Sequence, residues 1–106
     1  MATILPDIEK VVGRFIKLVS KEKRLLTVFV YGSHAKGSAG KWSDIDLAVV
    51  SNDFEEDLFE ERIRLMKLAL EIDERIEPVP FRPEDFIGAD PLVNEIRKSG
   101  VQIGLL

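Results

Sequence analysis

The sequence predicts a small α/β domain in which helices pack on a mixed β-sheet. Segments with apolar residues at helical spacing alternate along the chain with short runs rich in β-branched and aromatic residues. The 106 residues are 45% hydrophobic and 32% charged, a composition typical of globular proteins, and they suffice for one hydrophobic core. We therefore expect residues 1–106 to form a single domain.

The N-terminal half is expected to contain one helix and two strands. Apolar residues recur every three or four positions over residues 6–23, which predicts an amphipathic helix. Residues 25–31 are a compact apolar run that ends at Gly32 and predicts a buried strand. Residues 44–50 alternate at first and then become wholly apolar, so we expect a second strand with an exposed start and a buried end. The polar stretch between the strands predicts a loop with room for one helical turn.

The longest helix is expected over residues 54–73, with Asp53 as its N-terminal cap. We expect its apolar face to point to the core; this face comprises Phe59, Ile63, Met66 and Leu70. Acidic residues gather in its first turns, where the helix dipole favours them, and we interpret them as a solvated helix start rather than a metal cluster. Ion pairs are expected four residues apart, at Glu60–Arg64 and Glu71–Arg75.

The C-terminal segments complete the predicted sheet. Residues 76–81 alternate, but Pro78 and Pro80 lack amide hydrogens on the same side of the strand, which predicts an edge strand. Asp90-Pro91 begins a last helix that Gly100 ends, and residues 101–103 predict a short strand. We expect the helices over residues 6–23 and 54–73 to pack on one face of the sheet.

Composition excludes several classes of function. The chain has 15 Lys and Arg against 19 Asp and Glu, a net charge of −4, without a basic stripe, so we expect no direct nucleic-acid binding. With no cysteine and one histidine, any metal site must use carboxylates. No secretion signal and no apolar segment of about 20 residues is visible, so we expect a cytoplasmic protein without a membrane role.

Two carboxylates stand together at the start of the second strand. Asp44 and Asp46 are two residues apart, so on a strand they face the same side. Paired carboxylates suit Mg²⁺, although a lone Asp-x-Asp is more often a solvated strand end. The context favours a site, because Gly32-Ser33 leaves the preceding strand with backbone amides that can bind phosphate. Ser38 stands where a P-loop needs lysine, so that motif is excluded.

Residues 32–49 read GSHAKGSAGKWSDIDLAV, in which Gly-Ser, a mid-loop glycine and Asp-x-Asp follow a buried strand in order. This stretch resembles the signature of the polymerase β-like nucleotidyltransferase superfamily, and the short chain resembles its minimal nucleotidyltransferases in particular. The resemblance implies a polymerase β palm-like fold, ATP as substrate and Mg²⁺ as cofactor, with Mn²⁺ possible. It also implies that Gly32, Ser33 and Ser43 hold the phosphates, and that Asp44 and Asp46 bind metal.

A third acidic residue completes the site in that superfamily. Glu77 in the expected edge strand is best placed for this role, as a metal ligand and as the group that helps to activate the acceptor. The usual residue is aspartate, and glutamate is one methylene longer, which favours a distorted Mg²⁺ site or Mn²⁺. An alternative interpretation of Glu77 is a solvated acid at a sheet edge.

The resemblance implies transfer of a nucleoside monophosphate, AMP from ATP, to an acceptor hydroxyl. Minimal nucleotidyltransferases pair with helical HEPN-type proteins, several as antitoxins, so a HEPN-type partner is the expected acceptor. Two alternatives stay open. One is a small-molecule nucleotidyltransferase of the antibiotic-modifying kind, with a partner or a second copy closing the pocket. The other is a catalytically weak nucleotide-binding subunit that acts by protein association.

Expectations also follow for four further residues of the loop over 32–43. Lys36 and Lys41 are within reach of a triphosphate, but loop lysines are usually solvated. Trp42 is expected to anchor the loop to the core, because a lone large apolar loop residue usually does so. His34 is expected to be exposed and without a role.

Overall fold

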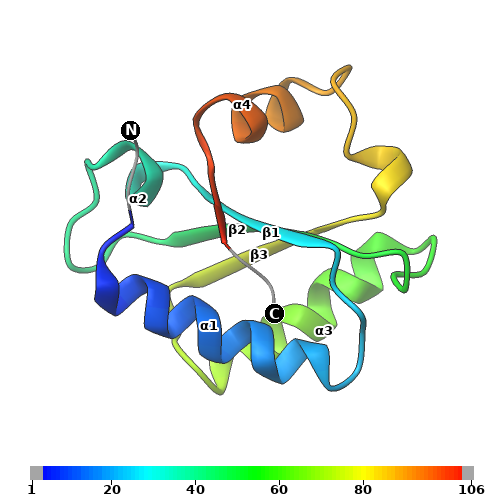
Figure 1. Cartoon of the computed structure of the whole chain (residues 1–106). Helices are drawn as coiled ribbons and strands as arrows, with labels where there is room; N and C mark the ends of the chain where they lie inside the picture. Colours follow the sequence, from blue (N-terminus) through cyan, green and yellow to red (C-terminus); the bar gives the residue numbers. More distant parts are fainter. Residues whose placement is uncertain (1–3, 104–106) are drawn as a thin grey trace.

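The structure, a computed structural model, describes residues 4–103 and confirms the predicted α/β class. Four strands form one sheet in the order β3-β2-β1-β4, with helices on both faces (Figure 1). The elements in chain order are α1 (Pro6–Ser20), β1 (Thr27–Tyr31), α2 (Ser33–Lys36), β2 (Ile45–Val50), α3 (Leu58–Leu70), β3 (Ile76–Phe81), the 3₁₀ turn η1 (Pro83–Asp85), α4 (Pro91–Ser99) and β4 (Val101–Ile103).

The sheet is mixed, as the sequence predicts. β1 pairs antiparallel with both β2 and β4, whereas β2 pairs parallel with β3. The carbonyls of Arg75 and Phe81 accept hydrogen bonds from the amides of Ile45 and Ser51, at 2.8 and 3.1 Å. Because the backbone groups of a strand alternate in direction, the even-numbered positions with the two prolines face the free edge. The prediction of an edge strand over residues 76–81 is confirmed.

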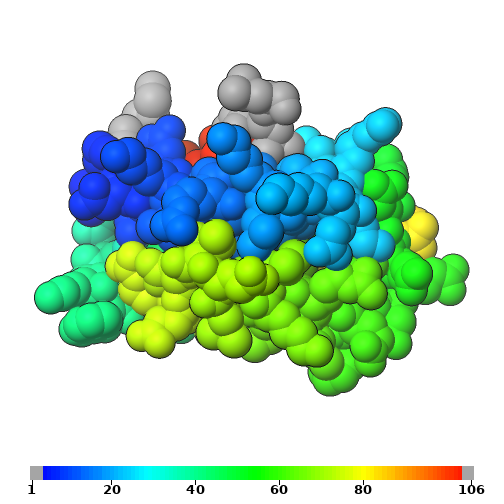
Figure 2. All heavy atoms as spheres, turned by 90° about the horizontal axis from the view of Figure 1, so that it is seen from below, coloured from blue at the N-terminus to red at the C-terminus, as the bar shows by residue number. Residues whose placement is uncertain are grey.

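The helices form layers on the two faces of the sheet. α1 and α3 lie side by side on one face, as expected, and Figure 2 shows this face from outside. Their buried side chains Val12, Phe15 and Leu65 form the larger core with the strands. α4 and η1 lie on the other face, over a smaller cluster that includes Val93 and Ile96. Asp46 and Glu77 lie half-buried on this second face, and Asp44 just before β2 is exposed.

The structure corrects the predicted orientation of α3. Leu65 and Ala69 are buried, whereas Phe59 and Leu70 of the expected core face are 69% and 70% exposed. Apolar residues occupy two faces of this helix, and the hydrophobic period alone does not say which of them meets the sheet. The helix also begins later than expected, after Asp57, whose side chain accepts a hydrogen bond from the Glu60 amide at 3.3 Å.

Asp53 is not the cap, contrary to expectation. Its carboxylate accepts a hydrogen bond from the Arg24 amide at 2.7 Å, so it joins two loops. The acidic segment is also less solvated than predicted, because Glu61 is only 3% exposed. The Glu61 carboxylate lies 3.3 Å from Lys23 Nζ and accepts a hydrogen bond from the Glu55 amide at 2.9 Å. A buried carboxylate needs such partners, which the sequence spacing did not indicate.

The two predicted ion pairs also differ in the structure. Arg64 pairs with Glu61, three residues away, at 3.5 Å, and Arg75 pairs with Asp73 at 2.8 Å. The predicted helix 54–73 ends at Leu70, so Arg75 lies beyond it and the helical spacing no longer applies. None of the helices within residues 4–103 has the length and apolar character needed to cross a bilayer.

Candidate active site

The strand register brings two of the three predicted acids together. Asp46 in β2 pairs with Glu77 in β3 on one side and with Tyr31 in β1 on the other. Side chains at paired positions share a face of the sheet, here the face that α4 partly covers. Asp44 lies just before β2 and is exposed. The acids thus occupy the starts of two parallel strands, next to the end of β1.

The electrostatic field at Asp46 reflects this crowding. Its pKa is raised, first because the carboxylate is partly buried and then because Asp44 and Glu77 add negative charge, while His34 opposes the shift. A carboxylate in such a field is stabilised by a cation. Hard divalent cations prefer oxygen ligands, so the donor set of Asp44, Asp46 and Glu77 fits Mg²⁺ or Mn²⁺ in chemical type.

The carboxylates do not converge into a ready-made metal centre. Within residues 4–103, no three acidic or histidine side chains lie close enough together to hold an ion. The charges of Asp44 and Glu77 nevertheless act on Asp46, because both contribute to its raised pKa.

Gly32 shapes the wall of the site next to Asp46. Its φ of 72° and ψ of −147° belong to a backbone region that glycine alone adopts readily. A Cβ at this position would collide with Oδ2 of Asp46. The Gly32 carbonyl accepts hydrogen bonds from the amides of Ala35 and Lys36, both at 3.1 Å, which begins α2. The motif glycine therefore serves two purposes, the sharp turn after β1 and space for the carboxylate.

We expect Gly32→Ala to cost about 1–3 kcal/mol of stability and to reduce activity at least tenfold, because the methyl group displaces the Asp46 carboxylate. Gly37→Ala is the matched control. Gly37 also has a positive φ, 78°, but a Cβ there meets no atom within 4 Å. Thermal melts and a transfer assay on both variants separate the two effects. Equal loss of activity in both variants would contradict the space-filling argument.

Ser33 and Ser43, the predicted phosphate-binding serines, lie at the two ends of the loop between β1 and β2. Ser33 is the first residue of α2, whose Ala35 and Lys36 amides bond to the Gly32 carbonyl, while its first two amides have no partner within the helix. Ser43 Oγ accepts a hydrogen bond from the Gly40 amide at 2.8 Å, so this hydroxyl shapes the loop. Both predicted residues thus border the acids, with Ser43 directly before Asp44.

Two further side chains fix this loop, and sequence reasoning missed both. His34 is buried, contrary to expectation, and its Nε2 lies 3.4 Å from the Ser43 carbonyl oxygen. Arg75 donates from Nη1 to the Lys41 carbonyl at 3.2 Å while Asp73 holds its guanidinium. The hydrogen bonds from Arg75 lower the pKa of Asp73. These contacts join residues 9 and 34 positions apart, beyond the reach of helical or strand periodicity, so no local pattern could indicate them.

The other loop predictions have mixed outcomes. Trp42 is 74% exposed, so it does not anchor the loop, and the Lys41 ammonium lies 5.2 Å from the centre of its ring. Stacking on a neighbouring cation replaces the expected core contact. Lys36 pairs with Glu95 of α4 at 2.9 Å and is half exposed, in agreement with a solvated lysine.

Tyr31 is the further member of the site that the sequence did not reveal. Its apolar strand context predicts a core residue, yet its register places it opposite Asp46. Its pKa is raised by burial and then by the negative charge of Asp46. The hydroxyl therefore stays protonated beside the acids and is available as a hydrogen-bond donor.

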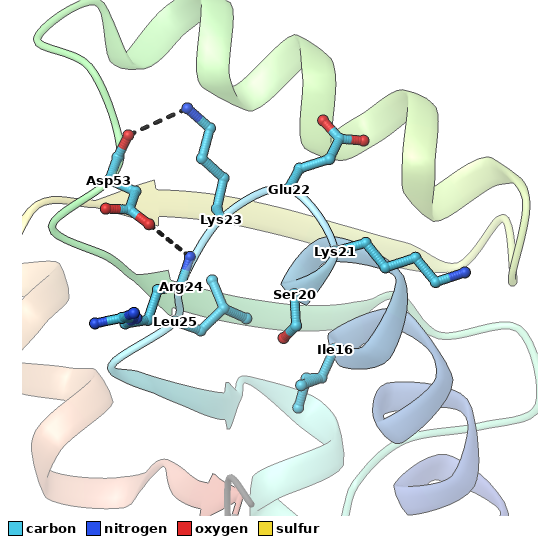
Figure 3. A pocket seen from close by; sticks show the side chains of 8 residues that line it. All are labelled: Ile16, Ser20, Lys21, Glu22, Lys23, Arg24, Leu25 and Asp53. Carbon is cyan, nitrogen blue, oxygen red and sulfur yellow. Dashed lines mark hydrogen bonds between the residues drawn. The ribbon is translucent and has the colours of Figure 1, made fainter.

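A separate hollow of about 620 Å³ lies at the opposite end of β2 (Figure 3). Asp53 accepts hydrogen bonds there from Lys23 Nζ, through its carbonyl at 3.1 Å, and from the Arg24 amide. The six residues of β2, about 20 Å in length, separate this end from Asp46. The hollow is therefore not part of the acidic site.

The class of protein follows from this arrangement. Acids at the starts of two parallel strands, beside a Gly-Ser turn that leaves a buried strand, are the parts that the resemblance implies for nucleotidyl transfer. The family model for the nucleotidyltransferase domain matches residues 12–103, and the chain belongs to this family. It is a nucleotidyltransferase by family. No curated protein matches the sequence closely enough to be a relative.

Similar solved structures agree in fold. A toxin–antitoxin structure with AMP-PNP superposes with a TM-score of 0.64 at 22% identity, covering 91% of this chain and 72% of that one. A protein of Sulfolobus solfataricus assigned as a nucleotidyltransferase gives 0.64 at 19% identity, with 91% and 78% covered. A mutant MntA–HpeT toxin–antitoxin structure gives 0.62 at 25% identity, with 88% and 71% covered.

Proposed function

We propose that this protein transfers AMP from ATP to a hydroxyl group of a partner protein, with a divalent metal ion as cofactor. The observation that carries the proposal is the position of Asp46. Its carboxylate lies against Gly32, at the turn predicted to bind phosphate, and within the field of the charges of Asp44 and Glu77. Membership of the nucleotidyltransferase domain family supports the reaction class.

Each residue has a chemical task in this reaction. Asp44, Asp46 and Glu77 would hold Mg²⁺ or Mn²⁺ after their carboxylates move closer together than in this structure. The ion neutralises phosphate charge and activates the attacking oxygen when bound. The first amides of α2 and the Ser33 hydroxyl would bind the phosphates. Glu77 accepts the proton of the acceptor hydroxyl, whose oxygen bonds to the α-phosphorus while the bond to the bridging oxygen breaks and pyrophosphate leaves.

A partner protein is the proposed acceptor because of the similar structures. Two of them are toxin–antitoxin structures, one of which was obtained with AMP-PNP. We propose a HEPN-type helical partner and an antitoxin role, as the resemblance of residues 32–49 implies. Asp44 is exposed and Asp46 and Glu77 are half-buried, so the acids are accessible to such a macromolecule.

A nucleotide-binding subunit with weak catalysis is the second candidate. Glu77 is the observation that favours it. Polymerase β-like nucleotidyltransferases usually have an aspartate at this position, and Glu77 lies in an edge strand. A longer side chain at a sheet edge holds its carboxylate less firmly than one packed between strands. Transfer assays with Glu77 variants separate the two candidates.

We expect ATP binding to require a divalent cation. The triphosphate carries about four negative charges, and the acids that already raise the pKa of Asp46 would repel it without a cation. Isothermal titration calorimetry with ATP and Mg²⁺, and with ATP and EDTA, tests this. Binding in Mg²⁺ and none in EDTA is the expected result, and equal affinity in both would remove the metal from the proposal.

A further inference from the structure

An apolar stripe runs along the outer side of α3 without a partner in the described chain. It comprises Phe59, Ile63, Met66 and Leu70, of which Phe59, Met66 and Leu70 are 69%, 41% and 70% exposed. Large apolar side chains exposed singly are common, but three exposed ones and the half-buried Ile63 in a row along one helix mark a surface that another molecule covers. We call these four residues the α3 stripe.

The α3 stripe points away from α1. Glu61 shows where α1 lies, because its carboxylate contacts Lys23 in the turn that follows α1. Successive helical residues are rotated by about 100°, so the stripe lies roughly 140–200° round the helix from Glu61. α3 therefore carries two apolar sides, one that packs on the sheet and one that faces outward.

The spacing of the stripe is that of a helix–helix seam. Its residues follow one another by four, three and four positions, which is the alternation of a and d positions in coiled coils. In such a seam the apolar side chains of one helix pack into the spaces between those of a second helix. A helix is thus the kind of element that fits this surface.

The charges beside the seam identify the occupant. Glu60 and Lys67 are seven residues apart on one flank, both exposed, and neither forms an ion pair with any residue in the range 4–103. In an antiparallel pair of identical helices each flank faces itself in reverse, so Glu60 meets Lys67 of the second copy, twice. In a parallel pair, Arg62 on the other flank meets Lys67 of the second copy, which is repulsive.

We propose that a second copy of this chain covers the α3 stripe, forming a symmetric dimer through antiparallel α3 helices. Phe59 packs against Leu70 of the second copy, and Ile63 against Met66. A three-turn seam is small, so the dimer belongs to the weak, concentration-dependent class. The acids lie on the other face of the sheet from α3, so both sites stay open in the dimer.

The first test measures association by sedimentation velocity over a concentration series. Phe59→Lys should weaken the dimer by about tenfold or more, because in a symmetric dimer the substitution removes the same contact at two places. Leu26→Lys is the matched control, since Leu26 is 47% exposed but lies outside the stripe. Circular dichroism verifies that both variants fold. A wild-type chain that stays monomeric at every concentration, or equal weakening by both variants, overturns the proposal.

A charge-swap experiment tests the antiparallel pairing itself. Glu60→Lys and Lys67→Glu should each weaken self-association roughly fivefold, because each brings like charges together twice. The double variant should restore it. Mixing the two single variants should yield a mixed dimer tighter than either parent, detected by energy transfer between labelled chains. Failure of both rescue and mixed-dimer formation overturns the pairing, and neither result depends on transfer activity.

Discussion

Replacing Asp44 and Asp46 together by asparagine should abolish nucleotidyl transfer, a loss of at least about 10³-fold. Amides keep the size of the side chains but remove the two negative charges that would hold a divalent cation. Label transfer from α-³²P-ATP in the presence of the partner protein measures the effect. The double variant Glu55→Gln/Glu56→Gln is the control, because it removes two exposed charges elsewhere.

The Asp44→Asn/Asp46→Asn variant should be as stable as the wild type, or slightly more stable, at neutral pH without metal. The folded-state pKa of Asp46 is raised, so its contribution to stability is present at low pH and is lost as the pH rises through that pKa. At neutral pH the charged wild-type carboxylate is therefore unfavourable, and the amide removes the penalty. Thermal melts should show the advantage of the variant shrinking as the pH falls. Transfer at the wild-type rate would contradict the catalytic assignment.

Glu77→Gln should reduce transfer by about 10²–10⁴-fold while keeping the partner complex and most of the ATP affinity. The amide cannot accept the proton of the acceptor, whereas Asp44 and Asp46 still anchor a cation. Glu74→Gln is the matched control, three residues earlier and exposed. Single-turnover transfer and calorimetry on both variants give the two readouts.

Glu77→Asp distinguishes an active enzyme from a nucleotide-binding subunit. In an enzyme adapted to glutamate, the shorter side chain withdraws the carboxylate by about one methylene and lowers the rate. In a weakly active site it restores the residue usual in the superfamily and raises the rate. Assays in Mg²⁺ and in Mn²⁺ cover both cation sizes. No transfer by the wild type or either variant, with partner binding intact, would leave the subunit interpretation.

The sequence by itself determined the elements that depend on local chemistry. Pro78 and Pro80 predicted the edge strand because a missing amide hydrogen cannot be supplied by packing. The spacing from Gly32 to Asp46 predicted the acidic site because the turn needs glycine at one end and the strand aligns its side chains at the other. The resemblance of this motif also gave the family, which the match over residues 12–103 confirms.

Only the tertiary structure decided which apolar side of α3 packs on the sheet and which residues hold the loop before Asp44. α3 carries two apolar sides, and the side with Leu65 and Ala69 packs on the sheet while buried Glu61 contacts Lys23. His34 and Arg75 hold the loop before Asp44 through contacts 9 and 34 residues apart in the sequence. Hydrophobic periodicity and residue spacing report neighbours within a few turns of chain, whereas these choices depend on long-range packing. The exposed α3 stripe is the consequence, and it could not be inferred before the helix was placed.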